Sequence, residues 1–343
     1  MKKIIIRVDG RKDLGMGHLH RCLIIAKYMH KNFGTVAHFI VEEDSVARAF
    51  FENKSSQGIK PHFFSCGSSL SVQAKILIDH SRDFEIKHIL IDLLEFNLTE
   101  VLIGPLRNNE LKIACIIDDS EYREVNVDLV LNGNPNQQPA KYEGLGGRYL
   151  IGFSYFIMSE KYDYGRLDFS GELKKVLVTL GGSDHNNLLF KLLNFLVESD
   201  EFEKVIVISS GASGYLDKLK NFANQHCGKL ELLVDIDGLY DTWKRCDFAI
   251  TAGGNTLFER IAAGVPGMTL CQLDRQMEIA QRFEQLGVNY NIGFGATLPL
   301  EELKEKIQNF VKDNSLAIKQ AKNFDNIMLG SGLRLFVKEL REL

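Results

Sequence analysis

The sequence of 343 residues contains no hydrophobic run near the roughly 20 apolar residues that cross a lipid bilayer. Near the N-terminus a short apolar run stops at Arg7 and Asp9. A secretory signal needs about 7–15 apolar residues followed by a small-residue cleavage site. We therefore expect residues 3–8 to form a buried strand, the protein to be cytoplasmic, and no stable insertion into a membrane.

The sequence also lacks a cysteine pairing pattern and a large excess of charge of either sign. The six cysteines include no C-x-x-C pair and have wide, irregular spacings, which argues against a disulfide framework or a zinc site. Lys and Arg number 41 against 45 Asp and Glu, for a formal net charge of −4. Such a balance provides no overall attraction for polyanions, so we expect no nucleic-acid partner.

The sequence does contain short β-branched runs that alternate with helical patterns, which is typical of βαβ units and a parallel sheet. In the first half, strands are expected at 3–8, 36–41, 88–91, 112–117 and 129–131, and helices at 18–31, 45–51, 71–81 and 99–108. In the second half, strands are expected at 175–179, 204–208, 230–234, 248–251 and 267–270. Its helices are expected at 187–198, 214–225, 238–245, 256–263, 275–286, 300–313 and 333–343.

The length of the chain favours two domains at roughly 150 residues each. A polar segment without periodicity, 159–171, separates the two series of strands and helices. We therefore predict an N-terminal domain over 1–160, a second domain over 172–330, and a C-terminal helix in 331–343 that packs back on the first domain. The Gly-, Asn-, Gln- and Pro-rich stretch 132–148 is expected to be a long loop, a kind of segment that often carries function.

A glycine-rich turn follows the first expected strand, and a helix starts directly after it. Unpaired N–H groups at a helix start, together with glycines that permit close approach, favour an anionic ligand. The spacing of Gly15, Gly17 and His18, G-x-G-H, differs from the dinucleotide fingerprint, and no P-loop pattern occurs. Because the positive end of a helix disfavours a cationic imidazole, we expect His18 to be neutral near pH 7 and able to accept a proton from water.

Simpler interpretations of this turn stay open. His18 could merely cap or pack at the helix start, and His20, on another helix face, is expected to have no role. Asp9 and Asp13 are interpreted as carboxylates that shape the loop, or that hold His18 or a sugar hydroxyl.

Two more glycine-marked turns follow strands in the second half, and each precedes a helix. Their backbone N–H groups could together cradle a diphosphate. The residues concerned are Gly181, Gly182, Ser183, Gly253, Gly254, Asn255 and Thr256. Glu259, one turn inside the second helix, could accept hydrogen bonds from a ribose diol, and Gln276 is expected to contact the sugar or base. Each of these features alone is more often a plain turn or a solvated side chain.

Several short motifs follow one another over about residues 4–295. They are GMGH at 15–18, RCL at 21–23, IDD at 117–119, YEGL at 142–145, IGFSY at 151–155, GGSD at 181–184 and GGNTLFE at 253–259. Together they resemble the PseG/SpsG family, the UDP-sugar hydrolases of pseudaminic acid biosynthesis, which are built like the MurG-type glycosyltransferases. The resemblance implies an α/β protein of GT-B fold, in which two Rossmann-like domains with parallel sheets face a central cleft.

The resemblance also implies a UDP-sugar substrate, with the nucleotide held mainly by the second domain. His18 would activate water for attack on the anomeric carbon, releasing UDP and a free diacetamido-trideoxy hexose for nonulosonic acid or surface polysaccharide biosynthesis. No metal, no cofactor and a monomer or weak oligomer are expected. The expected substrate contacts in the first domain are Asp9, Gly15, Gly17, Arg21, Asp119, Asn134, Tyr142 and Tyr155.

The chain departs from the family pattern in two places. Leu93 and Leu94 stand where the family often has a His-Tyr pair, and Met158 lies where it often has an arginine. The alternative function is a glycosyltransferase that uses the same donor and a sugar hydroxyl instead of water. A third is a nucleotide-sugar sensor without catalysis.

Overall fold

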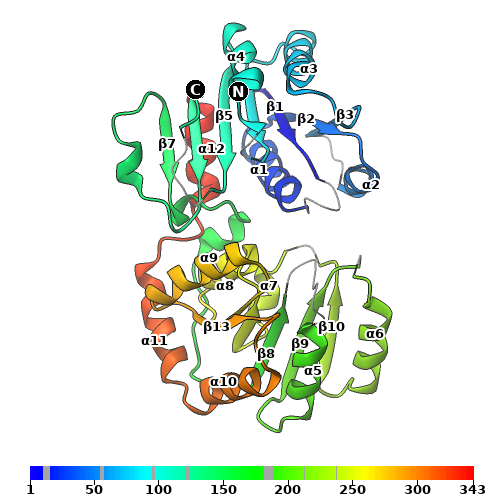
Figure 1. The fold of residues 1–343 in the computed structure, drawn as a ribbon, viewed down its shortest axis with the longest axis vertical. Coiled ribbons are helices and arrows are strands. Elements are labelled where there is room, and N and C mark those ends of the chain that lie inside the picture. The colour runs from blue at the N-terminus through cyan, green and yellow to red at the C-terminus, as the bar shows by residue number, and fades with distance from the viewer. Residues whose placement is uncertain are drawn as a thin grey trace. The chain divides into compact units, whose positions relative to one another are not determined.

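The computed structural model describes residues 1–10, 16–54, 58–94, 97–119, 124–180, 188–211, 213–236 and 238–343. Their contacts divide the chain into two compact units. Unit 1 comprises Met1–Glu160 with Gly330–Leu343, and unit 2 comprises Lys161–Leu329. Residues 161–171, which the sequence left between the domains, therefore belong to unit 2. Each unit consists of a sheet with helices packed on it (Figure 1).

Unit 1 contains a seven-stranded sheet whose neighbouring strands all pair in parallel, in the order β3-β2-β1-β4-β5-β6-β7. Its strands are β1 (Lys3–Val8), β2 (Val36–Glu42), β3 (Ile59–Phe64), β4 (His88–Asp92), β5 (Lys112–Ile117), β6 (Leu129–Asn132) and β7 (Arg148–Ile151). Its helices are α1 (Gly17–Phe33), α2 (Ser45–Lys54), α3 (Leu70–Asp83), α4 (Glu100–Asn108) and α12 (Gly332–Arg341), and η2 (Pro139–Tyr142) and η3 (Phe153–Tyr155) are short 3-10 helices. The strand order reverses between β1 and β4, and such switch points are where open α/β sheets bind ligands.

The core of unit 1 lies on both faces of this sheet. Successive side chains of β1 alternate between the faces, since Ile4 and Ile6 pack with α1 whereas Ile5 packs with α3 and α4. Burial on both faces explains the nearly continuous apolar sequence of the central strands. The C-terminal helix α12 buries Phe336 in the core on the α1 side of the sheet. Glu339 of α12 forms a 3.0 Å ion pair with Arg148 of β7.

Unit 2 contains a six-stranded parallel sheet in the order β10-β9-β8-β11-β12-β13, with its own switch point between β8 and β11. Its strands are β8 (Lys175–Thr179), β9 (Lys204–Ser209), β10 (Leu230–Val234), β11 (Phe248–Thr251), β12 (Gly267–Cys271) and β13 (Tyr290–Phe294). Its helices are α5 (Leu188–Glu198), α6 (Leu216–Gln225), α7 (Tyr240–Trp243), α8 (Asn255–Ala263), α9 (Asp274–Gln285), α10 (Leu300–Lys312) and α11 (Ser315–Asn323). The short helices η4 (Glu160–Tyr164) and η5 (Phe324–Asn326) complete the elements.

The α/β architecture with parallel sheets agrees with the sequence prediction, but three strands were missed. They are β3, β7 and β13, and each forms an edge of its sheet. An edge strand is exposed along one side and needs no continuous apolar run, and β3 even contains Pro61, which sheets tolerate at an edge. Helix α11 was also missed, and α7 is one turn long where a helix over 238–245 was expected. None of the helices in the described segments has both the length and the hydropathy to span a bilayer.

Candidate active site

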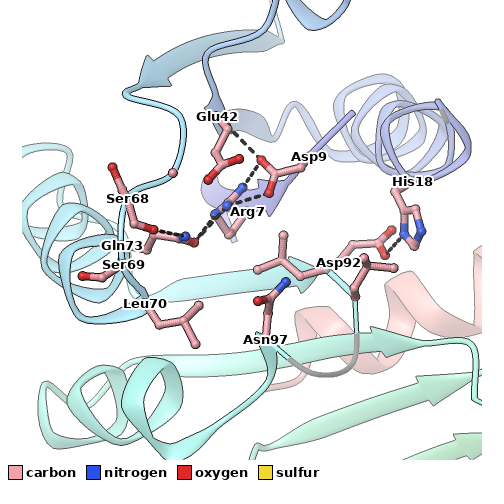
Figure 2. A pocket seen from close by; sticks show the side chains of 13 residues that line it. Arg7, Asp9, His18, Glu42, Ser68, Ser69, Leu70, Gln73, Asp92 and Asn97 are labelled. Atoms are coloured by element: carbon pink, nitrogen blue, oxygen red, sulfur yellow. Dashed lines mark hydrogen bonds and ion pairs between the residues drawn. The ribbon is translucent and has the colours of Figure 1, made fainter. Parts of the chain in front are cut away.

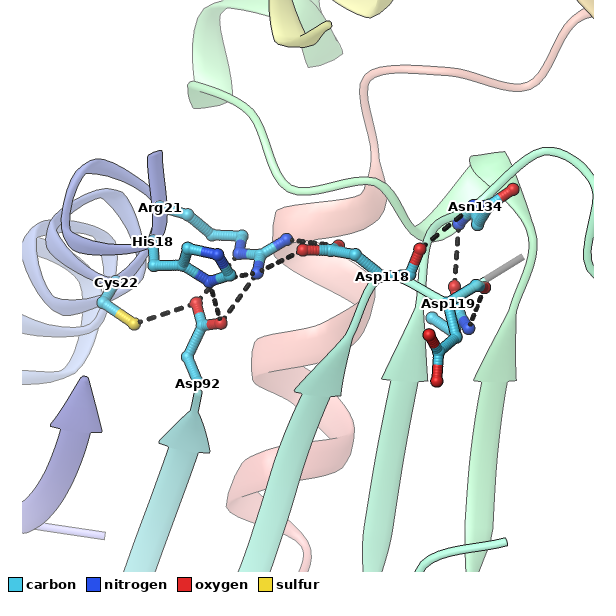
Figure 3. Close-up of polar contacts among 8 residues, drawn as sticks. His18, Arg21, Cys22, Asp92, Asp118, Asp119 and Asn134 are labelled. Carbon is cyan, nitrogen blue, oxygen red and sulfur yellow. Dashed lines mark hydrogen bonds and ion pairs between the residues drawn. The ribbon is translucent and has the colours of Figure 1, made fainter. Parts of the chain in front are cut away.

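The carboxyl ends of β1 and β4 bring His18 and Asp92 together at the switch point of unit 1 (Figure 3). His18 lies in the first turn of α1, and Asp92 is the last residue of β4. The Nδ1 atom of His18 is 2.7 Å from Oδ1 of Asp92. The Asp92 side chain is fully buried, whereas 22% of the His18 side chain is exposed. One ring nitrogen therefore contacts a buried carboxylate, while the His18 side chain as a whole is partly exposed.

Arg21, one turn further along α1, joins two carboxylates. Its Nε and Nη2 donate to Asp92 at 2.9 and 2.7 Å, and its Nη1 and Nη2 donate to Asp118 at 2.8 and 3.0 Å. Asp118 follows β5, the strand next to β4. Cys22 adds a weak hydrogen bond from its Sγ to Asp92 at 3.4 Å. Arg21, which the sequence assigned to the substrate, thus binds protein carboxylates in this structure.

The ionisation of Asp92 determines the tautomer of His18. Burial would raise the pKa of this carboxyl, but the charge of Arg21 and the hydrogen bond from His18 outweigh it and hold the pKa at about 2. An ionised carboxylate only accepts hydrogen bonds, so Nδ1 of His18 must carry its proton and donate to Asp92. The 3.1 Å approach of Arg21 Nη2 to Nδ1 is then a contact between two donors that share one acceptor. In the neutral ring, Nε2 is left with the lone pair of a base.

The pKa of His18 departs from the sequence prediction. Burial lowers it, but the hydrogen bond and the charge of Asp92 raise it by more, so the net pKa lies above 6.5. The direction of this shift is opposite to the one expected from the helix end, because a buried carboxylate in direct contact is a stronger influence than a helix N-terminus, and the neutral ring near pH 7 stays a prediction. The imidazolium is the favoured form of this ring at mildly acidic pH.

His18 also lines a pocket of about 290 Å³ that lies wholly in unit 1 (Figure 2). Part of its wall is polar, because the buried guanidinium of Arg7 donates to both oxygens of Asp9, at 2.5 and 2.7 Å, and to Gln73 Oε1 at 2.9 Å. The carboxylate of Asp9 pairs with Arg7 and accepts the Glu42 N–H at 3.0 Å, and its role in shaping the glycine-rich loop stays a prediction. At ~30 Å³ for each water, the pocket holds about ten water-sized groups, the size of one small polar molecule.

Apolar side chains form another part of the lining of this pocket. Leu70 at the start of α3, and Leu93 and Leu94 after β4, lie on its lining. Leu93 and Leu94 form one of the two departures from the family pattern, and Met158 forms the other. The structure therefore places the first of these departures beside His18 and Asp92, where it bears on what the pocket accepts.

The predicted site residues Asp119 and Asn134 belong to a loop network at the carboxyl ends of β5 and β6. Asn134 Nδ2 donates to the carbonyl oxygen of Asp118 at 3.0 Å. Asn132 and Gln137 donate their side-chain N–H groups to the carbonyl oxygen of Asp119, at 3.0 and 2.7 Å. These amides hold the backbone that presents Asp118 to Arg21.

Three other predicted residues of unit 1 lie in the described part of the chain, and two of them have contacts within the protein. The Tyr142 hydroxyl donates to Gln137 Oε1 at 3.0 Å, and Tyr142 is buried. Tyr155 in η3 packs partly buried against the core of unit 1, and Gly17 is the exposed first residue of α1. Contact of these residues with a substrate stays a prediction.

In unit 2, α8 begins directly after β11 at the second switch point. Gly254 precedes the helix, and a Cβ atom there would meet only Gln276 Nε2, at 4.0 Å. A Cβ atom at Gly253 would instead lie 2.7 Å from two atoms of Gln276, so Gly253 is required for the packing of α9 against this turn. Gln276 thus lies over the turn that leads to Asn255 and Thr256, and the space beside Gly254 leaves this helix end accessible.

Glu259 lies one turn inside α8. Desolvation raises the pKa of its carboxyl to about 7, although part of the side chain reaches solvent. Burial raises the pKa of Tyr162 most, and the negative charge of Glu259 raises it further. The Tyr162 hydroxyl accepts a hydrogen bond from Trp243 Nε1 at 3.0 Å. A carboxylate that is poorly solvated gains from any ligand that donates hydrogen bonds to it.

Some predicted residues cannot be placed. Asp13, Gly15, Gly181, Gly182 and Ser183 lie outside the described residues, so their contacts stay predictions. In contrast, the structure adds Asp92 and Asp118, which the sequence did not assign to the site. A usable signal existed for Asp92, because it is a lone carboxylate at the end of the apolar strand His88–Asp92.

Comparison with known proteins finds no family model that matches the chain. An uncharacterised protein of Methanocaldococcus jannaschii is 25% identical over 80% of this chain and 57% of its own length. The spore coat polysaccharide biosynthesis protein SpsG of Bacillus subtilis is 24% identical over 98% of this chain and 97% of the relative. The UDP-2,4-diacetamido-2,4,6-trideoxy-beta-L-altropyranose hydrolase of Campylobacter jejuni is 22% identical over 81% of this chain and 94% of the hydrolase. The chain thus spans little more than half of the first relative and nearly all of the other two, and the similarity to SpsG and to such a hydrolase confirms the sequence resemblance.

Solved structures establish the fold. MurG of Acinetobacter baumannii superposes with a TM-score of 0.72 at 11% identity, over 100% of both chains. HepE of Anabaena, solved in complex with UDP, superposes with a TM-score of 0.59 at 15% identity, also over 100% of both chains. At such low identity these likenesses concern the fold alone. The chain has the predicted GT-B fold of two α/β units, each of which contains a parallel sheet.

Proposed function

We propose that this chain is an enzyme that hydrolyses a UDP-linked sugar at the anomeric carbon, with His18 as the general base. The observation that carries the proposal is the His18–Asp92 pair, in which the base nitrogen Nε2 belongs to a ring on the wall of a pocket for one small polar molecule. The Campylobacter relative, by its name a UDP-sugar hydrolase, supports the choice of reaction.

The reaction is a single displacement by water. Nε2 of His18 removes a proton from water as its oxygen forms a bond to the anomeric carbon. The bond between this carbon and the β-phosphate oxygen breaks, and its electron pair leaves with UDP. Asp92 stabilises the imidazolium that forms and keeps the ring oriented. Because attack and departure take place on opposite sides of the carbon, the free sugar is released with inverted anomeric configuration.

Unit 2 supplies the nucleotide contacts in this proposal. The N–H groups at the start of α8 suit a diphosphate, and Glu259 suits the two hydroxyls of a ribose. The desolvated state of Glu259 supports this role, because hydrogen bonds from a ribose would offset the cost of its charge. The similar fold of HepE, a protein solved with UDP, also favours a uridine nucleotide.

Hydrolysis is tested by an NMR time course with a panel of UDP-sugars, beginning with a UDP-diacetamido-trideoxy hexose. The wild type should release free sugar of inverted configuration. His18→Gln should lower kcat by about 10²–10⁴-fold, the usual contribution of a general base, and leave UDP affinity nearly unchanged. His20→Gln is the matched control, because His20 is an exposed neighbour on α1 that packs edge-on against Phe50. Wild-type turnover by His18→Gln would contradict the assignment of the base.

A glycosyltransferase is the second candidate, favoured by the fold of MurG. Its chemistry differs only in the nucleophile, which would be a sugar hydroxyl. The same time course separates the two functions. Slow release of sugar that an added acceptor diverts into a new glycoside would identify a transferase.

The role of Glu259 is tested by the affinity for an intact UDP-sugar between pH 6 and pH 8, since its phosphodiesters do not titrate in that range. Affinity should rise as Glu259 ionises near its pKa of about 7, because only the carboxylate accepts both ribose hydroxyls. Glu259→Gln should abolish this pH dependence and weaken binding about tenfold, the value of roughly one charge-assisted hydrogen bond. Glu301→Gln, at a side chain that is 84% exposed on α10, is the control. Equal affinity of all three proteins at pH 8 would remove Glu259 from the nucleotide site.

A further inference from the structure

We propose that Asp118 is a positioning residue of the candidate site, which acts through Arg21 to balance the charge of the imidazolium that forms on His18. The kinetic part of this inference rests on the proposed hydrolysis, and the structural part does not. Nothing in the sequence motifs distinguishes this aspartate from its neighbour Asp119. The geometry around Arg21 does so.

Arg21 binds the two carboxylates with the two edges of one planar group. The edge formed by Nε and Nη2 faces Asp92, and the edge formed by Nη1 and Nη2 faces Asp118 (Figure 3). Side-chain exposure increases along this row, from 0% at Asp92 to 11% at Arg21 and 46% at Asp118. Two bidentate contacts leave the guanidinium a single orientation. Asp118 therefore helps to fix the guanidinium of Arg21. The guanidinium orients Asp92, and Asp92 in turn orients the His18 ring.

Asp118 is itself held more firmly than an ordinary surface carboxylate. Its carbonyl oxygen accepts a hydrogen bond from Asn134, and the next carbonyl, of Asp119, accepts hydrogen bonds from Asn132 and Gln137. Amide side chains from the end of β6 and from the loop after it thus hold the backbone carbonyl groups of Asp118 and Asp119. Such support indicates that the location of the Asp118 carboxylate is constrained by the fold.

The charges of these residues explain what Asp118 contributes. Asp92 and Arg21 carry opposite charges that cancel, so by themselves they would leave a protonated His18 as an excess positive charge at a largely buried site. Asp118 adds one negative charge, and the four groups are then neutral when His18 is protonated. Proton transfer from water to His18 thereby ends in a balanced site rather than in a buried excess charge.

Among the residues that the structure describes, other charged groups near His18 do not provide this balance. On the pocket wall, Arg7 and Asp9 pair with each other. Glu42, at the end of β2, is separated from β4 by β1 in the sheet. Cys22 donates a hydrogen bond to Asp92 and stays a neutral thiol, because burial raises its pKa well above the usual value.

The test is an NMR titration of the His18 ring nitrogens, assigned by their loss in His18→Gln. In Asp118→Asn the ring should titrate at lower pH than in the wild type, because a negative charge that favours the imidazolium is gone. Asp118→Glu should restore the titration toward the wild type. The control is Glu339→Gln, which removes a partly exposed ion pair with Arg148 on the far edge of the same sheet and should leave the His18 titration unchanged.

The titration does not depend on turnover, so the two proposals can fail separately. If no UDP-sugar is hydrolysed but Asp118→Asn moves the titration, the inference holds and the proposed function falls. If hydrolysis occurs but the titration is the same in both proteins, or moves to higher pH, the inference is overturned. Should Asp118→Asn not fold, Asp118→Ser offers the same two outcomes.

In the active enzyme, Asp118→Asn should move the acidic limb of the kcat/KM profile to lower pH. It should also lower kcat about two- to fivefold, on the scale of one partly exposed ion pair. A merely structural role would lower the Tm and the active fraction without moving the limb. An unmoved limb would therefore overturn the inference as well.

Discussion

Replacement of Asp92 by asparagine tests the feature on which the site depends, a buried carboxylate that accepts hydrogen bonds from both His18 and Arg21. Asparagine keeps the size of the side chain but offers one acceptor oxygen and one NH₂ group. If the NH₂ group faces Nδ1, the ring must change to the tautomer with a proton on Nε2, and the base is lost. If it faces Arg21 instead, two donors oppose each other in a buried place.

The size of the stability effect follows from the pKa of Asp92. A carboxyl whose pKa is about 2 in the folded protein and 3.8 ordinarily contributes on the order of 2–3 kcal/mol at neutral pH. Since the folded pKa is depressed, this contribution is complete above about pH 4 and is lost as the pH falls toward 2. Removal of one partner of a buried ion pair costs about 3–5 kcal/mol, but Arg21 keeps Asp118, so we expect a loss of about 2–3 kcal/mol.

The assays are urea denaturation at pH 7 and UDP release from the UDP-sugar that the wild type hydrolyses. Asp92→Asn should lose about 2–3 kcal/mol of unfolding free energy and about 10²–10⁴-fold of kcat. Asp128→Asn is a matched control, because Asp128 is a carboxylate in the same unit whose Oδ2 accepts the Ile113 N–H at 2.8 Å, away from the site. It should lose stability and keep kcat. Folded Asp92→Asn protein that retains more than about a tenth of the wild-type kcat would refute the tautomer argument.

Two further predictions concern stability. A Cβ atom on Gly267 would lie 2.1 Å from the carbonyl oxygen of Ala249 in the neighbouring strand, so Gly267→Ala should cost at least about 2 kcal/mol in urea denaturation. Gly214→Ala, with no heavy atom within 4 Å, should stay within about 0.5 kcal/mol, and equal stability of the two variants would disprove the close approach of β11 and β12. Burial and then the charge of His62 lower the pKa of His38 from 6.5 to about 4. As the pH drops from 6.5 to 4, the unfolded chain therefore binds this proton before the folded protein does, and the free energy of unfolding should decrease. His38→Phe should reduce that fall by about 1–2 kcal/mol, and an identical pH dependence in both proteins would exclude His38 as its source.

Local pattern was sufficient for most of the fold, because central strands of a parallel sheet are apolar on both faces and helices show one apolar face. Strands Lys3–Val8 and Lys175–Thr179 were therefore predicted with the same first and last residues that they have in the structure. Three of the four edge strands were missed, as Ile59–Phe64 illustrates, because this strand is only partly buried and mixes polar with apolar residues. Burial in the folded chain, rather than intrinsic preference, decided these segments.

The site shows the same division. His18 could be selected from the sequence because a glycine-rich turn between a strand and a helix puts it at the carboxyl edge of a sheet. Its ionisation could not be derived from that local setting. The helix end suggested a lowered pKa, whereas Asp92, a contact across 74 positions of the chain, raises it. Gly253 is another case, since its requirement comes from Gln276 on α9 and not from the ligand that the turn suggested.

Sequence alone determined the alternation of strands and helices, the G-x-G-H turn and the resemblance to UDP-sugar enzymes, because these depend on residues close together in the chain. Tertiary structure decided which side chains meet His18. The carboxyl ends of β1, β4 and β5 share one edge of a parallel sheet, and this edge unites residues up to 97 positions apart, as the pair of Arg21 with Asp118 illustrates. Proton affinities in the site follow from these long-range charges and from burial, and neither is encoded in any one segment.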